Sequence, residues 1–215
     1  MQLICNIIFS YLIGSISGSI VLGKLKGDDI RTMGSGNAGG TNAFRTIGPI
    51  FALGVIIIDI LKGYIAVLYI SQLLFIQSNN FYTIEIMNIS CGIAAVIGHV
   101  YPIYYSFQGG KGAGTLIGIV AALFPQCILY ALLSWLCIII TTGYVGLATI
   151  VAGTALSIST YLIGNIAIEY FYFSISMSFF ILFTHRSNIY RMITGKENQF
   201  KKAMIFRSFF KKYLD

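Results

Sequence analysis

The residues best suited to chemistry lie in a short polar segment, MGSGNAGGTNAFRT, at residues 33–46. Its glycines permit positive φ and close approach of the backbone, so successive N–H groups can converge on an anion. Arg45 adds a planar guanidinium that can donate two parallel hydrogen bonds to a phosphate group. The segment is therefore a candidate anion cradle, with a flexible loop of similar composition as the alternative. The candidate residues of this cradle are Gly34, Ser35, Gly36, Asn37, Gly39, Gly40, Thr41, Asn42 and Arg45.

A second polar segment, GHVYPIYYSFQGGKGAGT at residues 98–115, contains a lysine flanked by glycines. Its ammonium group is open to any bound oxyanion. The segment is not a Walker A loop, because Tyr105 stands where that pattern requires its first glycine. His99 lies near the end of an apolar stretch, where an ionisable group is costly and usually has a function. The alternatives are a hydrogen-bonded interfacial histidine and a lysine that only marks topology. The candidates in this segment are His99, Gly109, Gly110, Lys111 and Gly112.

The third polar segment, HRSNIYRMITGKEN at residues 185–198, offers the polar residues His185, Asn188, Arg191 and Glu197. His185 and Asn188 are three residues apart, so on a helix they share a face. The basic residues that follow are typical of a tail that meets anionic lipid. Asp59 and Lys62 have the same spacing inside an apolar run, which predicts a structural ion pair, with a direct contact to substrate as the alternative.

The composition of the chain indicates a membrane protein. The chain is 57% hydrophobic and 10% charged, and its mean hydropathy is +0.83. A soluble domain has about 25% charged residues. The apolar runs are long and do not alternate with polar residues, which favours a polytopic bundle of transmembrane helices over a β-barrel.

The basic residues predict the topology of this all-α bundle. Lys62 is the only one of the 14 Lys and Arg residues inside a predicted span. By the positive-inside rule, the three polar segments and the C-terminus are cytoplasmic and the N-terminus is outside. The loop Gln77–Glu85 carries no basic residue and is placed outside. We predict spans at 3–23, 50–76 and 86–106, then four more separated by breaks at 124–126, 141–143 and 164–165. Seven spans are expected, five are the alternative, and residues 1–215 form one domain.

No cofactor or metal is expected. The four cysteines lie in apolar runs without a CxxC pair, and two histidines without a carboxylate cluster do not suggest a metal site. The composition offers no reason to expect a nucleic acid partner.

With these residues placed, the sequence resembles the bacterial acyl-phosphate:glycerol-3-phosphate acyltransferases, a family of integral membrane enzymes. The resemblance is carried by GSGNAGGTNAFRT, by GHVYPIYYSFQGGKGAGT, by HRSNIYR with GKE, and by DILKG in the second predicted span. It covers nearly the whole chain, in the same order and with the same spacing.

The resemblance implies transfer of a fatty acyl group from acyl phosphate to the 1-hydroxyl of sn-glycerol 3-phosphate, giving lysophosphatidic acid and phosphate for phospholipid synthesis. It implies seven spans in the lipid bilayer of the bacterial inner membrane, with the site at the cytoplasmic face. The enzyme that makes acyl phosphate is the implied functional neighbour. Acyl-CoA and acyl carrier protein are not the implied donors, and neither His99 nor His185 begins the HxxxxD pattern of acyltransferases that use them.

The resemblance also assigns residue roles by position. Ser35, Arg45 and Lys111 resemble the family's phosphate-contacting residues, and His99, His185 and Asn188 resemble its further polar site residues. These six are the candidate catalytic residues. Glu197 matches the glutamate of the third motif and is assigned, with the glycines, Asn37, Thr41 and Asn42, to substrate binding. The chain departs from the family where Gly143-Tyr144-Val145-Gly146 replaces an Arg-Tyr-Val-Ser run, which leaves Thr142 or Thr149 to replace a phosphate contact.

Both implied substrates carry phosphate, which explains a glycine cradle with Arg45 and Lys111 at the membrane face. No Ser-His-Asp triad is evident, and acyl phosphate is activated enough for direct attack. The base would be His99 or a substrate phosphate. A small membrane transporter of phosphate or a phosphate ester is the alternative function. It would need inverted repeats and broken helices near the midplane, and neither is evident in the sequence.

Overall fold

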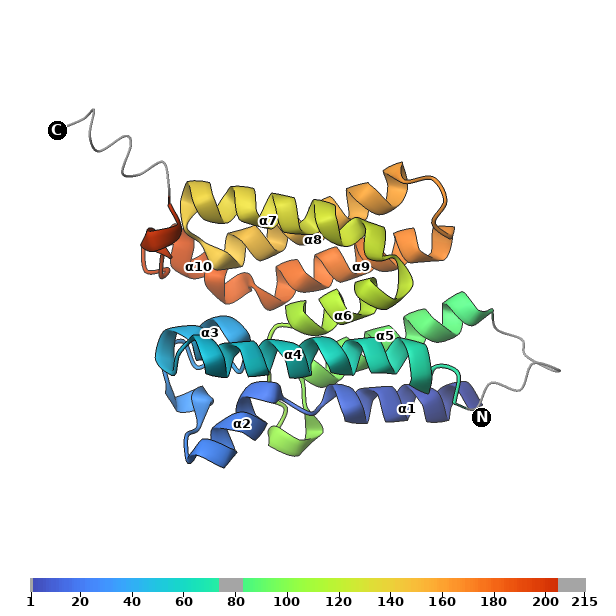
Figure 1. Cartoon of the computed structure of the whole chain (residues 1–215), viewed down its shortest axis with the longest axis horizontal. Coiled ribbons are helices and arrows are strands. Elements are labelled where there is room, and N and C mark those ends of the chain that lie inside the picture. The colour runs from blue at the N-terminus through green and yellow to red at the C-terminus, as the bar shows by residue number, and fades with distance from the viewer. Residues whose placement is uncertain (1, 74–82, 205–215) are drawn as a thin grey trace. The chain divides into compact units, whose positions relative to one another are not determined.

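Helices make up the regular structure of this computed structural model, which describes residues 2–73 and 83–204 (Figure 1). No strand occurs within these two ranges, as the predicted all-α class requires. The chain divides into two compact units, Met1–Pro125 and Gln126–Asp215. The two glycine-rich segments belong to the first unit, and the third polar segment belongs to the second.

The first unit is built on two close helix pairs, α1 with α5 and α4 with α6. Short helices before α4 carry the first glycine-rich segment, and a turn before α6 carries the second (Figure 1). Its elements are α1 (Gln2–Gly14), α2 (Gly18–Lys26), η1 (Ile30–Thr32), α3 (Gly40–Thr46), α4 (Pro49–Ile65), the π-helical turn η2 (Ala66–Ile70), α5 (Ile84–Val100), η3 (Ile103–Tyr105) and α6 (Ala113–Leu123).

Glycines let both helix pairs approach closely. A Cβ on Gly118 of α6 would overlap the carbonyl oxygen of Ile60 in α4, and one on Gly63 of α4 would overlap that of Thr115. Gly14 and Ala95 make the same kind of contact between α1 and α5. Small residues at helix contacts are typical of membrane bundles, where packing and not hydrophobic burial drives association.

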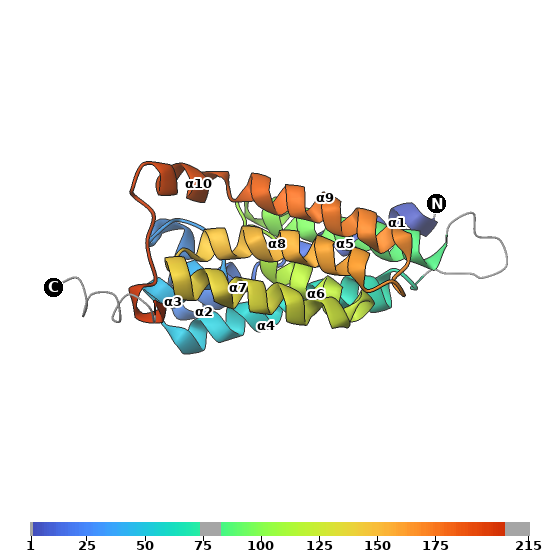
Figure 2. The same cartoon turned by 90° about the horizontal axis from the view of Figure 1, so that it is seen from above.

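The second unit is an antiparallel arrangement of three long helices in which α8 packs against both α7 and α9 (Figure 2). The short helix α10 follows α9 directly. The elements are η4 (Pro125–Cys127), which leads into the unit, α7 (Ile128–Thr142), α8 (Val145–Leu162), α9 (Ile168–Thr184), α10 (Arg186–Ile193) and η5 (Lys201–Ala203). The predicted breaks at 124–126, 141–143 and 164–165 all coincide with the ends of these helices.

Within the residues that the structure describes, four apolar helices are long enough to cross a membrane: Pro49–Ile70, Ile84–Tyr105, Pro125–Thr142 and Val145–Leu162. The bent pair Leu3–Gly14 and Gly18–Lys26 would make a fifth span. Two further apolar helices are shorter, Ala113–Leu123 and Ile168–Thr184. An 11-residue helix such as α6 extends over only about 16 Å of a hydrocarbon layer of about 30 Å. Seven spans and the orientation of the termini therefore remain predictions.

The predicted first span, 3–23, is interrupted in the structure. Its helix breaks after Gly14 and resumes at Gly18 with a bend of 41°. A hydropathy pattern does not reveal this break, because the small residues at the break are close to neutral in hydropathy. Two partners of the interrupted backbone come from α4, where Lys62 and Asp59 contact the peptide groups of Ile16 and Gly18.

The predicted orientation has a direct test in cysteine labelling. In a variant without the native cysteines, a cysteine at Asn79 should react with an impermeant maleimide in intact cells. A cysteine at the exposed Lys196 should react only after the membrane is permeabilised, because positively charged segments stay in the cytoplasm. Asn79 lies outside the described residues, so this expectation rests on sequence alone. The reverse labelling pattern would overturn the predicted topology.

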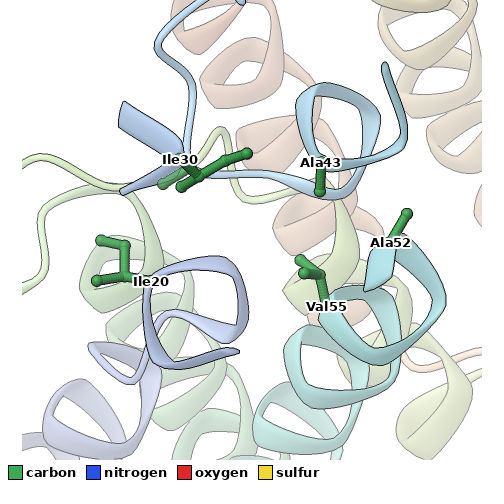
Figure 3. Packing of buried hydrophobic residues seen from close by; sticks show 6 residues of the cluster. Ile20, Ile30, Ala43, Ala52 and Val55 are labelled. Atoms are coloured by element: carbon green, nitrogen blue, oxygen red, sulfur yellow. The ribbon is translucent and has the colours of Figure 1, made fainter. Parts of the chain in front are cut away.

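A buried apolar cluster fixes the first glycine-rich segment to the first unit (Figure 3). Ile20 of α2, Ile30 of η1 and Ala43 of α3 point into the same space as Ala52 and Val55 of α4. Ala38, within the segment, is also fully buried in this cluster. The apolar residues between the glycines therefore anchor a segment that would otherwise be a flexible loop.

Candidate functional site

The first glycine-rich segment is a built turn and not a flexible loop. Gly34 and Gly36 have φ of 56° and 72°, in the left-handed region that favours glycine. The side chain of Asn42 holds the turn from inside. Its Oδ1 accepts a hydrogen bond from the Ser35 N–H at 3.0 Å, and its Nδ2 donates to the Met33 carbonyl at 2.9 Å.

This arrangement gives Asn42 a structural task. The side chain is buried, and Nδ2 also lies 3.3 Å from the carbonyl oxygen of Ile30. Both ends of its amide thus serve the loop. The sequence interpretation grouped Asn42 with the substrate donors, because composition does not distinguish a donor that faces a ligand from one that holds its own loop.

Three candidate residues of the segment face outward from the first unit. Ser35 and Thr41 are exposed, and Arg45 is exposed in the last turn of α3. Gly39 is the N-cap of α3, and Asn37 is half-buried beside it. The turn, the start of α3 and the Arg45 guanidinium therefore belong to one short stretch of surface that the apolar cluster holds in place.

The second glycine-rich segment returns onto the end of α5. The N–H groups of Gly109 and Gly110 donate to the carbonyls of Val100 and His99, at 3.2 and 3.1 Å. Gly112 has a φ of 89° and is the N-cap of α6. Lys111 thus lies directly before a helix N-terminus, where the helix dipole favours an anion.

The two glycine-rich segments lie against each other within the first unit. Nη1 of Arg31 donates to the carbonyl of Tyr105 at 3.4 Å, and the Lys24 ammonium lies 5.5 Å from the Tyr105 ring centre. A Cβ on Gly110 would lie 3.0 Å from the carbonyl oxygen of Ala38. The structure therefore brings together the two segments that the sequence singled out separately.

Arg31 is a basic residue of this region that its neighbour already engages. Its guanidinium pairs with the Asp29 carboxylate at 2.8 Å, and hydrogen bonds from Arg31 lower the pKa of Asp29 to about 2. The same pair raises the pKa of Arg31. Both groups are charged throughout the physiological pH range, so Arg31 stabilises the turn before the cradle.

The predicted ion pair between Asp59 and Lys62 is confirmed. Its Oδ1 and Nζ atoms are 3.0 Å apart, and both side chains are buried in α4. His99 is buried beside them, with Nδ1 3.5 Å from Asp59 Oδ1. No spacing rule links His99 to the Asp59–Lys62 pair, because these residues lie on different helices.

In the second unit, His185 lies at the junction of α9 and α10 and is buried. Its Nδ1 is 2.8 Å from the carbonyl oxygen of Ile181, so this nitrogen must carry a proton. In the neutral ring Nε2 is then the acceptor. The Asn188 N–H donates to the His185 carbonyl at 2.9 Å, and the two residues share one turn as their spacing predicts.

Glu197 holds the side chain of Asn188 in place. Its Oε1 accepts a hydrogen bond from Asn188 Nδ2 at 2.9 Å, and its Oε2 accepts from Arg191 Nε at 2.6 Å. The Glu197 side chain is only 2% exposed. Both carboxylate oxygens are thus engaged within the unit, and Arg191, a basic residue of the third polar segment, is a partner that spacing did not reveal.

Removing this carboxylate should weaken the unit and its activity. Glu197→Ala leaves Asn188 without its acceptor and Arg191 without its ion partner, which costs about 1–3 kcal/mol of unfolding free energy. We expect a lower melting temperature in detergent and a fall in kcat/KM. Glu85→Ala removes a carboxylate from α5 and is the control. Equal stability and activity of the Glu197→Ala and Glu85→Ala variants would contradict this role.

Two glycines, Gly143 and Gly146, lie at the turn between α7 and α8. A Cβ on Gly146 would lie 2.8 Å from Cβ, Cγ and Nδ2 of Asn188, so the glycine makes room for that side chain. Gly143 has a φ of 72°, and its carbonyl accepts from the Phe200 N–H at 2.7 Å. Thr142 and Thr149, the suggested replacements, both donate to backbone carbonyls of their own helices.

Comparison with known proteins shows which family the chain resembles. A family model described as glycerol-3-phosphate acyltransferase matches residues 4–195. A glycerol-3-phosphate acyltransferase of Aquifex aeolicus is 36% identical over 200 residues, covering 93% of this chain and 100% of the relative. One from Halalkalibacterium halodurans is 39% identical over 197 residues, covering 90% of this chain and 93% of the relative.

Solved structures give the same result. The crystal structure of PlsY, an integral membrane glycerol 3-phosphate acyltransferase, in its glycerol 3-phosphate form has a TM-score of 0.82 and 36% identity, covering 93% of this chain and 96% of that chain. Its lysophosphatidic acid form has a TM-score of 0.81 over the same shares. The residues matched by the family model, 4–195, include both glycine-rich segments as well as His185 and Asn188.

Proposed function

Because the chain belongs to the glycerol-3-phosphate acyltransferase family, we propose that it transfers a fatty acyl group from acyl phosphate to the 1-hydroxyl of sn-glycerol 3-phosphate. The products are lysophosphatidic acid and inorganic phosphate, and the reaction belongs to phospholipid synthesis. The enzyme works in the bacterial inner membrane with its site at the cytoplasmic face, beside the enzyme that makes acyl phosphate.

One observation supports this proposal most strongly: the two glycine-rich segments touch within the first unit. The turn held by Asn42 and the loop around Lys111 adjoin where Gly110 meets Ala38, and the exposed Arg45 belongs to the short helix that follows this turn. Both substrates carry a phosphate group, and such a region suits phosphate binding. Ser35, Arg45 and Lys111 are the proposed phosphate contacts, and the acyl chain lies among the apolar helices.

The proposed chemistry is a direct displacement. The oxygen of the glycerol 1-hydroxyl attacks the acyl carbon, a C–O ester bond forms, and the bond between that carbon and the phosphate oxygen breaks. The phosphate leaves with the electron pair and takes up the hydroxyl proton. No acyl-enzyme is formed, and positioning with charge stabilisation supplies most of the rate. The burial of His99 favours a substrate phosphate, and not this histidine, as the base.

His185 and Asn188 are the proposed further polar contacts of the second unit. The Ile181 carbonyl accepts a hydrogen bond from Nδ1 of His185 and fixes the orientation of its ring, and Glu197 fixes the orientation of the Asn188 amide. Each side chain is therefore preorganised by a neighbour of its own unit. Preorganised dipoles stabilise developing charge without a cost of reorientation during the reaction.

The proposed function is tested with purified protein in detergent, where no sealed compartment exists. Acyl phosphate and glycerol 3-phosphate should give lysophosphatidic acid and phosphate in equal amounts, and omitting glycerol 3-phosphate should stop the release of phosphate. A transporter of phosphate esters would form no new ester bond under these conditions. Absence of lysophosphatidic acid from well-folded protein would overturn the proposal.

A further inference from the structure

A buried polar cluster lies where α1 breaks and α2 begins. Asp59, Lys62 and His99 come from α4 and α5, and each residue is 3% exposed. Two ionised side chains and an imidazole are expensive to bury in a membrane helix bundle. Such a cluster persists when its members contact one another and carry out a task that apolar residues cannot.

The ion pair of this cluster fixes the helix break. Nζ of Lys62 donates to the carbonyl of Ile16 at 2.8 Å, and Asp59 Oδ1 lies 3.4 Å from the N–H of Gly18 as its acceptor. A helix that is interrupted leaves peptide groups without intrahelical partners. The Lys62 ammonium serves the free carbonyl and the Asp59 carboxylate serves the free N–H. These two contacts fix the point where α2 begins and hence its direction.

The histidine of this cluster supports the second glycine-rich segment. A Cβ on Gly110 would overlap Nε2 of His99, so the backbone of Gly110 rests directly on the edge of the ring. On the other side of Lys111, a Cβ on Gly114 would lie 3.1 Å from Cβ of Asp59. The loop that carries Lys111 is therefore in contact with the cluster both before and after the lysine.

Each nitrogen of the His99 ring has a neighbour in the first unit. Asp59 faces the buried Nδ1 at 3.5 Å, which is long for a hydrogen bond, and the backbone of Gly110 lies against the edge of the ring that carries Nε2.

We propose that Asp59, Lys62 and His99 are positioning residues that set the place of the Lys111 loop, and that His99 acts through Gly110 and not on the substrate. The inference rests on the proposed function, because it takes the Lys111 loop as a phosphate-binding element. It reassigns His99 from the candidate catalytic residues to the support of that loop.

The test is a double-mutant cycle between His99 and Gly110. Gly110→Ala introduces a Cβ into the space of the His99 ring, and we expect it to lower kcat/KM by at least about tenfold, mainly through KM. His99→Ala removes the ring and leaves a cavity, which also raises KM. In the His99→Ala background, adding Gly110→Ala should cost less than about threefold, because the obstructing ring is gone.

A second variant separates support from proton transfer. His99→Gln keeps a similar length and volume but cannot act as a base near neutral pH. We expect its kcat to stay within about threefold of wild type, with the larger change in KM. In the His99→Gln background, Gly110→Ala should lower kcat/KM by the same factor as in the wild type, because the glutamine side chain still fills the space beside Gly110.

A matched control lies on the same helix. Asn88 is also buried in α5, 11 positions before His99, or about 16 Å along the helix axis. Asn88→Ala should lower the melting temperature and leave KM unchanged. If His99→Ala does not fold, His99→Ser takes its place in the cycle, because its hydroxyl can pair with the buried Asp59.

Two outcomes would overturn the inference while the wild type remains active with acyl phosphate. One is an additive cycle, in which Gly110→Ala costs the same factor with and without the ring. The other is a folded His99→Gln variant that loses kcat at unchanged KM, which would place His99 in the chemical step. An inactive wild type would instead count against the proposed function, so the two failures are distinguishable.

Discussion

Arg45→Lys is expected to lower kcat/KM by about ten- to a thousandfold. The guanidinium can bind a phosphate group through two parallel hydrogen bonds, and a lysine ammonium cannot reproduce this geometry. One charge-assisted hydrogen bond contributes about 1.5–3 kcal/mol, and each 1.4 kcal/mol corresponds to about tenfold. Steady-state kinetics with acyl phosphate and glycerol 3-phosphate measure the change.

The Arg45→Lys variant should stay folded, because Arg45 is exposed in the last turn of α3 and lies outside the apolar cluster that anchors this region. Lys26→Arg, in the exposed last turn of α2, is the control and should leave kcat/KM nearly unchanged. Wild-type kinetics of a well-folded Arg45→Lys variant would reduce Arg45 to a marker of topology and remove the main cation of the proposed cradle.

Gly118→Leu is expected to abolish the packing of α6 on α4. The added Cβ would coincide with the backbone carbonyl of Ile60, and a backbone cannot move aside as a flexible side chain can. Overpacking of this kind costs about 1–3 kcal/mol or more. Since α6 begins directly after the Lys111 loop, activity should be lost together with stability.

The matched control for this change is Gly153→Ala in α8. A Cβ there would lie 3.6 Å from Oγ of Ser178, an ordinary contact distance. Melting temperatures and the yield of folded protein in detergent compare the two variants. A Gly118→Leu protein that melts like Gly153→Ala would show that α4 and α6 are not as close as the structure has them.

Much of the site could be predicted from the sequence, because polar residues inside an apolar chain are conspicuous. The two glycine-rich segments, the shared turn of His185 and Asn188, and the Asp59–Lys62 pair all follow from composition and short spacing. The helix breaks at 124–126 and 141–143 follow from proline, glycine and threonine between apolar runs. Local rules suffice wherever both partners lie within one helical turn.

The remaining features depend on contacts between distant residues. Asn42 holds its own turn, Arg191 pairs with Glu197, and His99 lies beneath Gly110. A pattern that marks a polar residue does not say whether it faces a ligand or a neighbour. The break after Gly14 was missed for a related reason, because Asp59 and Lys62 of another helix stabilise it.

The donor of the acyl group is the most direct test of this account. Purified protein is given glycerol 3-phosphate with acyl phosphate, acyl-CoA or acyl carrier protein as three separate donors of the same chain length, and the formation of lysophosphatidic acid is followed. The phosphate-binding segments and the absence of an HxxxxD pattern predict turnover with acyl phosphate alone. Comparable turnover with acyl-CoA or acyl carrier protein, or none with acyl phosphate, would contradict the account.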